Sequence, residues 1–132
     1  MSNEIAVVKQ HWLELASKLE DLPAPFQQEI FLLDCPIAGT SYIRGIKAKV
    51  DKLGEGDKLT FRRQPKNKHD PLAIAVYSAA RARIGWVPRA DNAVLARLMD
   101  AGKLIYGRVA ERKPAEQDGW IYIRMNIYMR DV

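Results

Sequence analysis

The chain has little cysteine, little histidine and no long apolar run. Cys35 is the single cysteine among 132 residues, which excludes an internal disulfide. No run approaches the roughly 18 apolar residues of a membrane-spanning helix, and the N-terminus lacks the basic-then-apolar layout of a signal peptide. We therefore expect a cytoplasmic protein with no membrane association, in which Cys35 is a buried, inert thiol.

The motifs that carry most metal and nucleophilic chemistry are also missing. The two histidines, His11 and His69, belong to different expected elements, and there is no C-x-x-C, H-E-x-x-H or clustered carboxylate set. No G-x-S-x-G elbow or phosphate-cradling glycine loop is present. Asp70 has only His69 beside it as a partner for acid–base catalysis. We expect no metal, no cofactor and no enzymatic activity, and keep a nuclease as a minority hypothesis.

Charge is distributed unevenly along the chain, whose net charge is +5. Residues 1–35 hold two basic against six acidic residues, a net charge of −4, whereas residues 36–132 hold nineteen against ten, a net charge of +9. A basic body is typical of proteins that bind polyanions, because a summed positive field concentrates phosphates. Many domains are basic for solubility alone, and charge by itself does not separate these two interpretations.

The first 25 residues predict an acidic amphipathic helix and a linker. Apolar residues recur at steps of three and four: Ile5, Val8, Trp12, Leu15 and Leu19. Pro23 and Pro25 end the helix. We therefore divide the chain into residues 1–25, helix and linker, and residues 26–132, one domain. The apolar stripe can pack on the domain, contact a partner protein or form a homodimer, and we favour packing on the domain.

Short strand-like runs fill the remainder of the chain. Six are expected, at residues 29–37, 57–63, 72–77, 82–87, 104–112 and 120–128. Residues 91–101 predict a helix that ends before Gly102. Its apolar side consists of Val94, Leu95, Leu98 and Met99. The expected fold class is mainly β, a small OB-like barrel of about six strands with two or three helices, the N-terminal amphipathic helix included.

The densest run of cations lies between residues 44 and 68. It holds nine Lys or Arg against three Asp or Glu, a net charge of +6. Loops on a small barrel place such donors along a curved surface, as phosphate binding requires, while stacking on bases needs aromatic faces beside the charges. The rings near turns are Tyr42, His69, Trp86 and Trp120. Of these we expect Tyr42 and His69 to be exposed and Trp86 to be the most buried of the four.

Asp70 is the one carboxylate of residues 61–77. Because a carboxylate repels a phosphate backbone, the physical argument favours an Asx turn or a cap ahead of Pro71. The other interpretation is that Asp70 accepts a hydrogen bond from a sugar hydroxyl at a strand terminus, where the last phosphate is missing.

Four pieces of the sequence, in order, resemble the HIRAN domain. They are IAGTSYIRG (37–45), GDKLTFRRQPKNKHDPLAIAVY (56–77), IGWVPR (84–89) and LARLMDAGK (95–103). The pattern R-x-P-x-N-x-x-D-P-x-A-I-x-V in the second piece is the most distinctive, and the resemblance spans about residues 31–128. HIRAN domains occur at the N-terminus of eukaryotic DNA remodellers and as small bacterial proteins.

The resemblance implies an OB-like barrel that captures the 3′ end of single-stranded DNA. It places Tyr42 and His69 where the family stacks terminal bases, Asp70 where it contacts the 3′ hydroxyl, and Arg89 where it contacts a phosphate. A carboxylate suits that position because it accepts from a hydroxyl and repels a phosphate. The chain departs from the pattern at Ser41, where DNA-binding eukaryotic members carry a basic residue, and at His69, where they carry a tyrosine.

The leading hypothesis is therefore a non-enzymatic module that binds single-stranded DNA and captures its 3′ end. Its expected nucleic-acid contacts are Tyr42, Arg44, Arg63, Lys68, His69, Asp70 and Arg89. The hypothesis predicts strong salt dependence of binding. The rival hypothesis is a protein-interaction module that docks an acidic peptide on its basic domain, or a partner protein through the Trp12 stripe.

Overall fold

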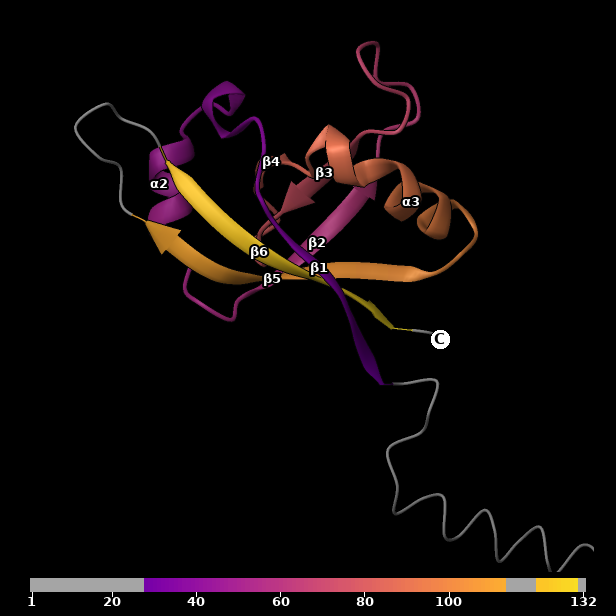
Figure 1. Cartoon of the computed structure of the whole chain (residues 1–132). Helices are drawn as coiled ribbons and strands as arrows, with labels where there is room; N and C mark the ends of the chain where they lie inside the picture. The colour runs from indigo at the N-terminus through magenta and orange to yellow at the C-terminus, as the bar shows by residue number, and fades with distance from the viewer. Residues whose placement is uncertain (1–27, 114–120, 131–132) are drawn as a thin grey trace, which may run out of the picture.

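Six antiparallel strands form one sheet in the computed structural model, which describes residues 28–113 and 121–130 (Figure 1). The strands are β1 (Glu29–Pro36), β2 (Lys58–Arg63), β3 (Ile74–Tyr77), β4 (Arg83–Trp86), β5 (Leu104–Lys113) and β6 (Tyr122–Arg130). Their order in space is β1-β6-β5-β2-β3-β4. The expected N-terminal helix with His11 and Trp12, and the side chain of Trp120, lie outside the described residues.

Alternation of apolar residues explains why these segments are strands. In β6 the inward positions are Ile123, Met125 and Ile127, each at most 1% exposed. In β2, Leu59 and Phe61 occupy the same inner face. Side chains of a strand alternate between its two faces, so every second side chain points toward the core and one face of the sheet becomes buried. The six expected strands are confirmed, with ends that differ by no more than two residues.

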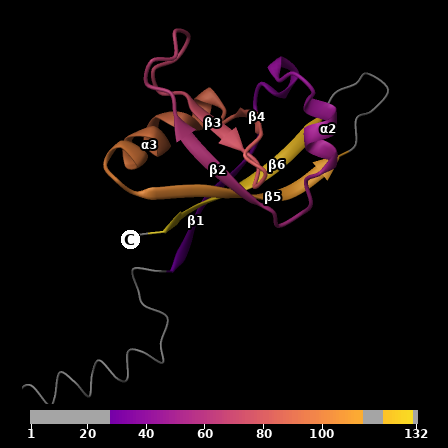
Figure 2. The same cartoon turned by 180° about the vertical axis from the view of Figure 1, so that it is seen from behind.

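Helices pack near the two ends of the sheet, as Figures 1 and 2 both show. The longest helix of the described residues is α3 (Arg89–Asp100), which follows β4 in the chain and buries Leu95 and Ala96 in the core. Val94 is 68% exposed, so its expected place on the apolar side of this helix is wrong. The short elements η2 (Thr40–Tyr42) and α2 (Ile46–Asp51) were not expected from the sequence.

The expected OB-like barrel is wrong in one respect, because the six-stranded sheet is not closed into a barrel. A single bridge pair, Ala38 and Trp86, connects the segment after β1 with β4 through two backbone hydrogen bonds of 2.8 Å. The pairing ends there because Gly39, at φ 70°, turns the chain away into η2. The fold is therefore a curved six-stranded sheet whose two edge strands, β1 and β4, are connected only through the Ala38–Trp86 bridge in the described residues. Within the two described ranges, no helix is long and apolar enough to cross a membrane.

Candidate functional site

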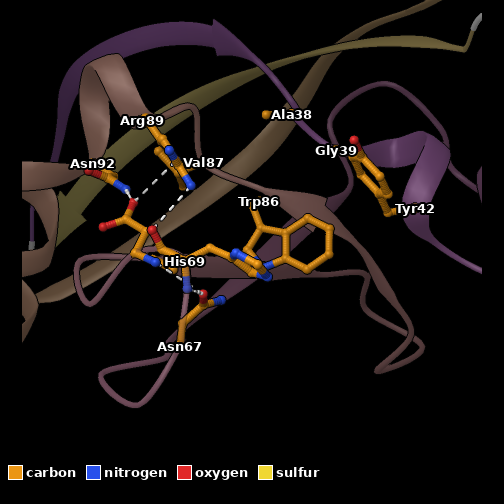
Figure 3. Close-up of a pocket in the computed structure, with 11 residues that line it drawn as sticks. Ala38, Gly39, Tyr42, Asn67, His69, Trp86, Val87, Arg89 and Asn92 are labelled. Atoms are coloured by element: carbon orange, nitrogen blue, oxygen red, sulfur yellow. Dashed lines mark hydrogen bonds and ion pairs between the residues drawn. The ribbon is translucent and has the colours of Figure 1, made fainter.

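A pocket of about 520 Å³ opens where the 64–73 loop, the end of β4, the start of α3 and the segment after β1 meet (Figure 3). Its ring side chains are Tyr42, His69 and Trp86. Its polar side chains are Asn67, Asp70, Arg89 and Asn92. In the view of Figure 3, Trp86 lies between His69 and Tyr42. The fold thus brings four of the seven predicted contact residues to one site: Tyr42, His69, Asp70 and Arg89.

The loop that carries His69 and Asp70 is held by side-chain amides. Asn67 Oδ1 accepts hydrogen bonds from the backbone N–H groups of His69 (2.9 Å) and Asp70 (3.2 Å). Gln64 Oε1 accepts from Asn67 Nδ2 (3.0 Å) and from Trp86 Nε1 (2.9 Å). The loop is therefore tied to the pocket wall by bonds within the protein, which reduces the entropy that binding must overcome.

Asp70 makes the expected Asx turn and also borders the pocket. Its Oδ1 accepts from the backbone N–H of Leu72 at 2.9 Å, and its Oδ2 accepts from Asn92 Nδ2 at 2.7 Å. The hydrogen bond from Asn92, followed by that from Leu72, holds the pKa of the Asp70 carboxyl below its usual value, and the Arg89 and Arg63 guanidinium groups act in the same direction. Asp70 is therefore ionised at neutral pH.

Arg89 lies at the mouth of the pocket with a side chain that is 73% exposed. Its Nη2 donates to the backbone carbonyl of His69 at 3.2 Å, and its Nε is 3.9 Å from Asp70 Oδ2. Both contacts orient the guanidinium, which carries five N–H donors. Most of these donors remain directed toward solvent and are available to an anion.

The wall opposite the loop is built from Gly39 and Trp86. A Cβ on Gly39 would lie 2.6 Å from Trp86 Cε3, so the glycine backbone packs directly on the indole. Trp86 is half-buried and is more buried than Tyr42 and His69, as expected, and its ring also lines the pocket. The expected exposure of Tyr42, at 85%, and of His69 is confirmed.

The three remaining predicted contact residues lie outside this pocket. Arg44 and Lys68 are exposed. Arg63 is used internally: its guanidinium donates to the carbonyls of Ala73 (2.8 Å) and Pro71 (3.0 Å) and pairs with Asp100 at 3.0 Å. Because its side chain is only 13% exposed, Arg63 braces the base of the loop.

Sequence reasoning missed two amides of the site. Asn92 is 3% exposed, although a polar residue in the first turn of a helix normally predicts a solvent-facing position. Gln64 has no sequence signal beyond its place between Arg63 and Pro65. In the two described ranges, no group of three or more His, Cys, Asp or Glu side chains is arranged to hold a metal ion.

Comparison with known proteins identifies the fold. The HIRAN domain model matches residues 30–130. The chain belongs to the HIRAN domain family. A HIRAN fold was expected from the four sequence pieces, and the match confirms that resemblance over nearly the same residues. No curated protein matches the chain significantly in sequence.

Solved structures share this HIRAN fold. A protein from Lactobacillus plantarum is 25% identical, with a TM-score of 0.70 over 77% of this chain and 95% of that one. The HIRAN domain of human HLTF is 19% identical, with a TM-score of 0.58 over 76% of this chain and 78% of that one. The HLTF HIRAN domain in its DNA-bound conformation is 18% identical, with a TM-score of 0.53 over 77% and 79%.

Proposed function

We propose that this HIRAN domain is a non-enzymatic module that binds single-stranded DNA and holds its 3′ end in the pocket beside Asp70. The observation that carries the proposal is the ionised Asp70 carboxylate, 18% exposed, in a pocket whose other side chains are rings, amides, small apolar groups and one arginine. The DNA-bound conformation of the similarly folded HLTF domain supports DNA as the ligand.

Asp70 suits a sugar hydroxyl. A carboxylate has about four acceptor sites, and the Leu72 N–H and the Asn92 amide occupy one on each oxygen. The remaining sites can accept a hydroxyl proton, and the two fixed donors hold the carboxylate in one orientation before DNA arrives. A terminal 3′ phosphate, at about −1.5 to −2 charge, would be repelled at the same position. One side chain therefore attracts a free end and rejects a phosphorylated one.

The neighbouring side chains suit the nucleotide that bears this hydroxyl. The rings of Tyr42, His69 and Trp86 offer stacking surfaces, which are tolerant of base identity. The exposed N–H groups of Arg89 can bind the last internucleotide phosphate in a bidentate manner. Arg44 and Lys68, both exposed, contribute to the electrostatic approach, whereas Arg63 acts as a brace.

The experiment is a binding panel of labelled single strands that differ only at their ends. We expect a strand with a 3′ hydroxyl to bind at least about tenfold more tightly than the same strand with a 3′ phosphate, with affinity that falls steeply as salt rises. A strand phosphorylated at its 5′ end is the matched control and should bind like the unmodified one. Equal affinity for the two 3′ ends would contradict the proposal that the pocket captures a free 3′ end. No binding of any oligonucleotide at low salt would remove nucleic acid as the ligand and favour an acidic protein partner.

A further inference from the structure

A single cross-strand row of side chains crosses the outer face of the sheet. The outer row consists of Phe31, Tyr128, Tyr106, Thr60, Tyr77 and Arg83, each directly opposite the next on the neighbouring strand. Directly opposite residues share a face of a sheet. Because the alternate positions, such as Leu59 and Ile127, are in the core, the outer row lies on the face that points away from it.

Aromatic contacts make the row continuous on the side of β1, β6 and β5. The Phe31 and Tyr128 rings meet edge to face at 5.8 Å, and the Tyr128 and Tyr106 rings stack at 5.9 Å. Phe31 is 56% exposed, so a large apolar side chain is open to solvent at the β1 end of the row.

Three cations lie over the Tyr106 ring. Lys58 Nζ is 5.0 Å from the Tyr106 centroid, and the guanidinium carbons of Arg130 and Arg108 are 5.7 and 5.9 Å from it. These three cations cover the Tyr106 ring, which is 3% exposed, so the middle of the row presents positive charges to solvent and not a free ring face. Arg130 Nε is buried and has no hydrogen-bond partner in the described part of the chain.

The same arrangement continues across β2, β3 and β4. Arg62 lies 5.0 Å from the Tyr77 centroid, and Arg83 lies 5.6 Å from the Trp86 centroid. Five cations therefore lie over the rings of Tyr106, Tyr77 and Trp86, and one of them, Arg108, is paired with a carboxylate, Glu29 Oε1, at 3.0 Å. The outer row combines rings with a strong excess of positive charge.

The outer row runs directly into the pocket. Trp86 is opposite Ala75, two positions from Tyr77 on β3, so its ring lies on the same face of the sheet as the row. The Trp86 ring lines the pocket and also contacts Arg83, the last member of the row.

We propose that the outer row binds the nucleotides that lead away from the captured end, so that the strand crosses the sheet from Trp86 to Phe31. This inference rests on the proposed function of the pocket. Alternating charges and rings fit single-stranded nucleic acid, whose phosphates and bases need both, better than an acidic peptide, which needs only the charges. Six strands at about 4.8 Å spacing span about 24 Å, within the range of single-strand sites on small β-domains.

The test is the affinity of 3′-hydroxyl strands of about 3 to 12 nucleotides, a range that includes strands confined to the pocket and strands long enough to cross the sheet. The wild type should bind the longest at least about tenfold more tightly than the shortest. Arg62→Gln with Arg83→Gln should remove most of this gain and lower the salt slope by about 1.4, because each lost phosphate contact removes about 0.7. The matched control is Arg97→Gln, which removes an exposed cation from α3, the helix that packs on the inner face.

Phe31→Leu supplies a second variant that keeps an apolar side chain and all charges. It should lower the affinity for the longest strand several-fold and leave both the affinity for the shortest strand and the salt slope unchanged. The preference for a 3′ hydroxyl over a 3′ phosphate should be the same in all four proteins. If the wild type shows no such preference but its affinity still increases with strand length, the proposed capture of the 3′ end in the pocket is wrong and the proposed role of the row is not.

Two results would overturn the outer row as a nucleic-acid track. One is an affinity that does not increase with strand length, or an increase with length that is as large in the Arg62→Gln, Arg83→Gln double variant as in the Arg97→Gln control. The other is displacement of the longest strand by polyglutamate as effectively, charge for charge, as by unlabelled DNA, which would show a surface for any polyanion.

Discussion

Asn92 Nδ2 donates a 2.7 Å hydrogen bond to Asp70 Oδ2 and so joins helix α3 to the loop that follows β2. Asn92 is 3% exposed, and its amide is fixed by the helix around it. The position of the Asp70 carboxylate in the pocket therefore depends on the packing of α3 as well as on the local turn at Leu72. A rigid helix thus orients a group that the chain carries on a loop, which is how a loop residue acquires a defined direction before it meets a ligand.

Gly39 and Gly45 form a matched pair for testing the wall of the pocket. Both have positive φ, 70° and 69°, but a Cβ on Gly39 would contact Trp86 at 2.6 Å whereas one on Gly45 meets no atom within 4 Å. We expect Gly45→Ala to cost about 1 kcal/mol of unfolding free energy from backbone strain alone. Gly39→Ala should cost about 2–4 kcal/mol because the clash adds to it. Urea denaturation of both variants measures the difference, and equal costs would contradict the contact.

The hydrogen bond from Trp86 Nε1 to Gln64 Oε1 should couple the loop to the wall. In a double-mutant cycle of Trp86→Phe and Gln64→Ala, we expect a coupling free energy of about 1 kcal/mol, the usual size for a partly buried neutral hydrogen bond. Phenylalanine keeps a ring but has no donor. Additive effects on unfolding in urea would mean that this bond does not hold the loop.

Arg63 should stabilise the fold without contacting DNA. Because its guanidinium bonds to two carbonyls and to Asp100, Arg63→Gln should lower the unfolding free energy by about 2 kcal/mol. Its effect on the salt slope of DNA binding should be negligible. Lys68→Gln is the comparison: it removes an exposed cation beside the pocket and should lower the slope by about 0.7. A lower slope for Arg63→Gln with unchanged stability would restore Arg63 as a phosphate contact.

Cys35 should be unreactive in the folded protein. Burial, with smaller contributions from Asp91 and Asp34, raises the pKa of the Cys35 thiol to about 12. At pH 8 only about one molecule in ten thousand then carries the thiolate, which is the reactive form. An aromatic disulfide reagent should therefore label Cys35 only after unfolding in urea. Labelling of the native protein at the rate of free cysteine would contradict the buried position.

The sequence was sufficient to predict the strands because their apolar residues alternate, as Leu59 with Phe61 and Ile123 with Met125 do. It was insufficient for α2, a six-residue helix whose Lys and Ala content gives no clear period. The open sheet was also missed, because barrel closure depends on pairing between residues far apart in the chain, and here it stops at Ala38 and Trp86.

The sequence predicted the exposed residues of the candidate site but not the buried amides that hold them in place. Tyr42, His69 and Arg89 are exposed, as binding residues on loops often are. Asn92 and Gln64 gave no signal, because a buried amide is recognised only by the partner that three-dimensional packing brings to it. The same limitation made Arg63 resemble its exposed neighbour Arg62, since charge alone does not distinguish a brace from a binding group.

The most direct test of end capture is the ratio of affinities for 3′-hydroxyl and 3′-phosphate strands in the Asp70→Asn variant at pH 7. The wild-type carboxylate is ionised there because its pKa is held below the usual 3.8, and asparagine keeps the shape of the side chain without the charge. We predict that the preference of about tenfold or more falls to nearly one, while the affinity for the phosphorylated strand falls little or rises. A preference that Asp70→Asn leaves unchanged would contradict the central role of Asp70.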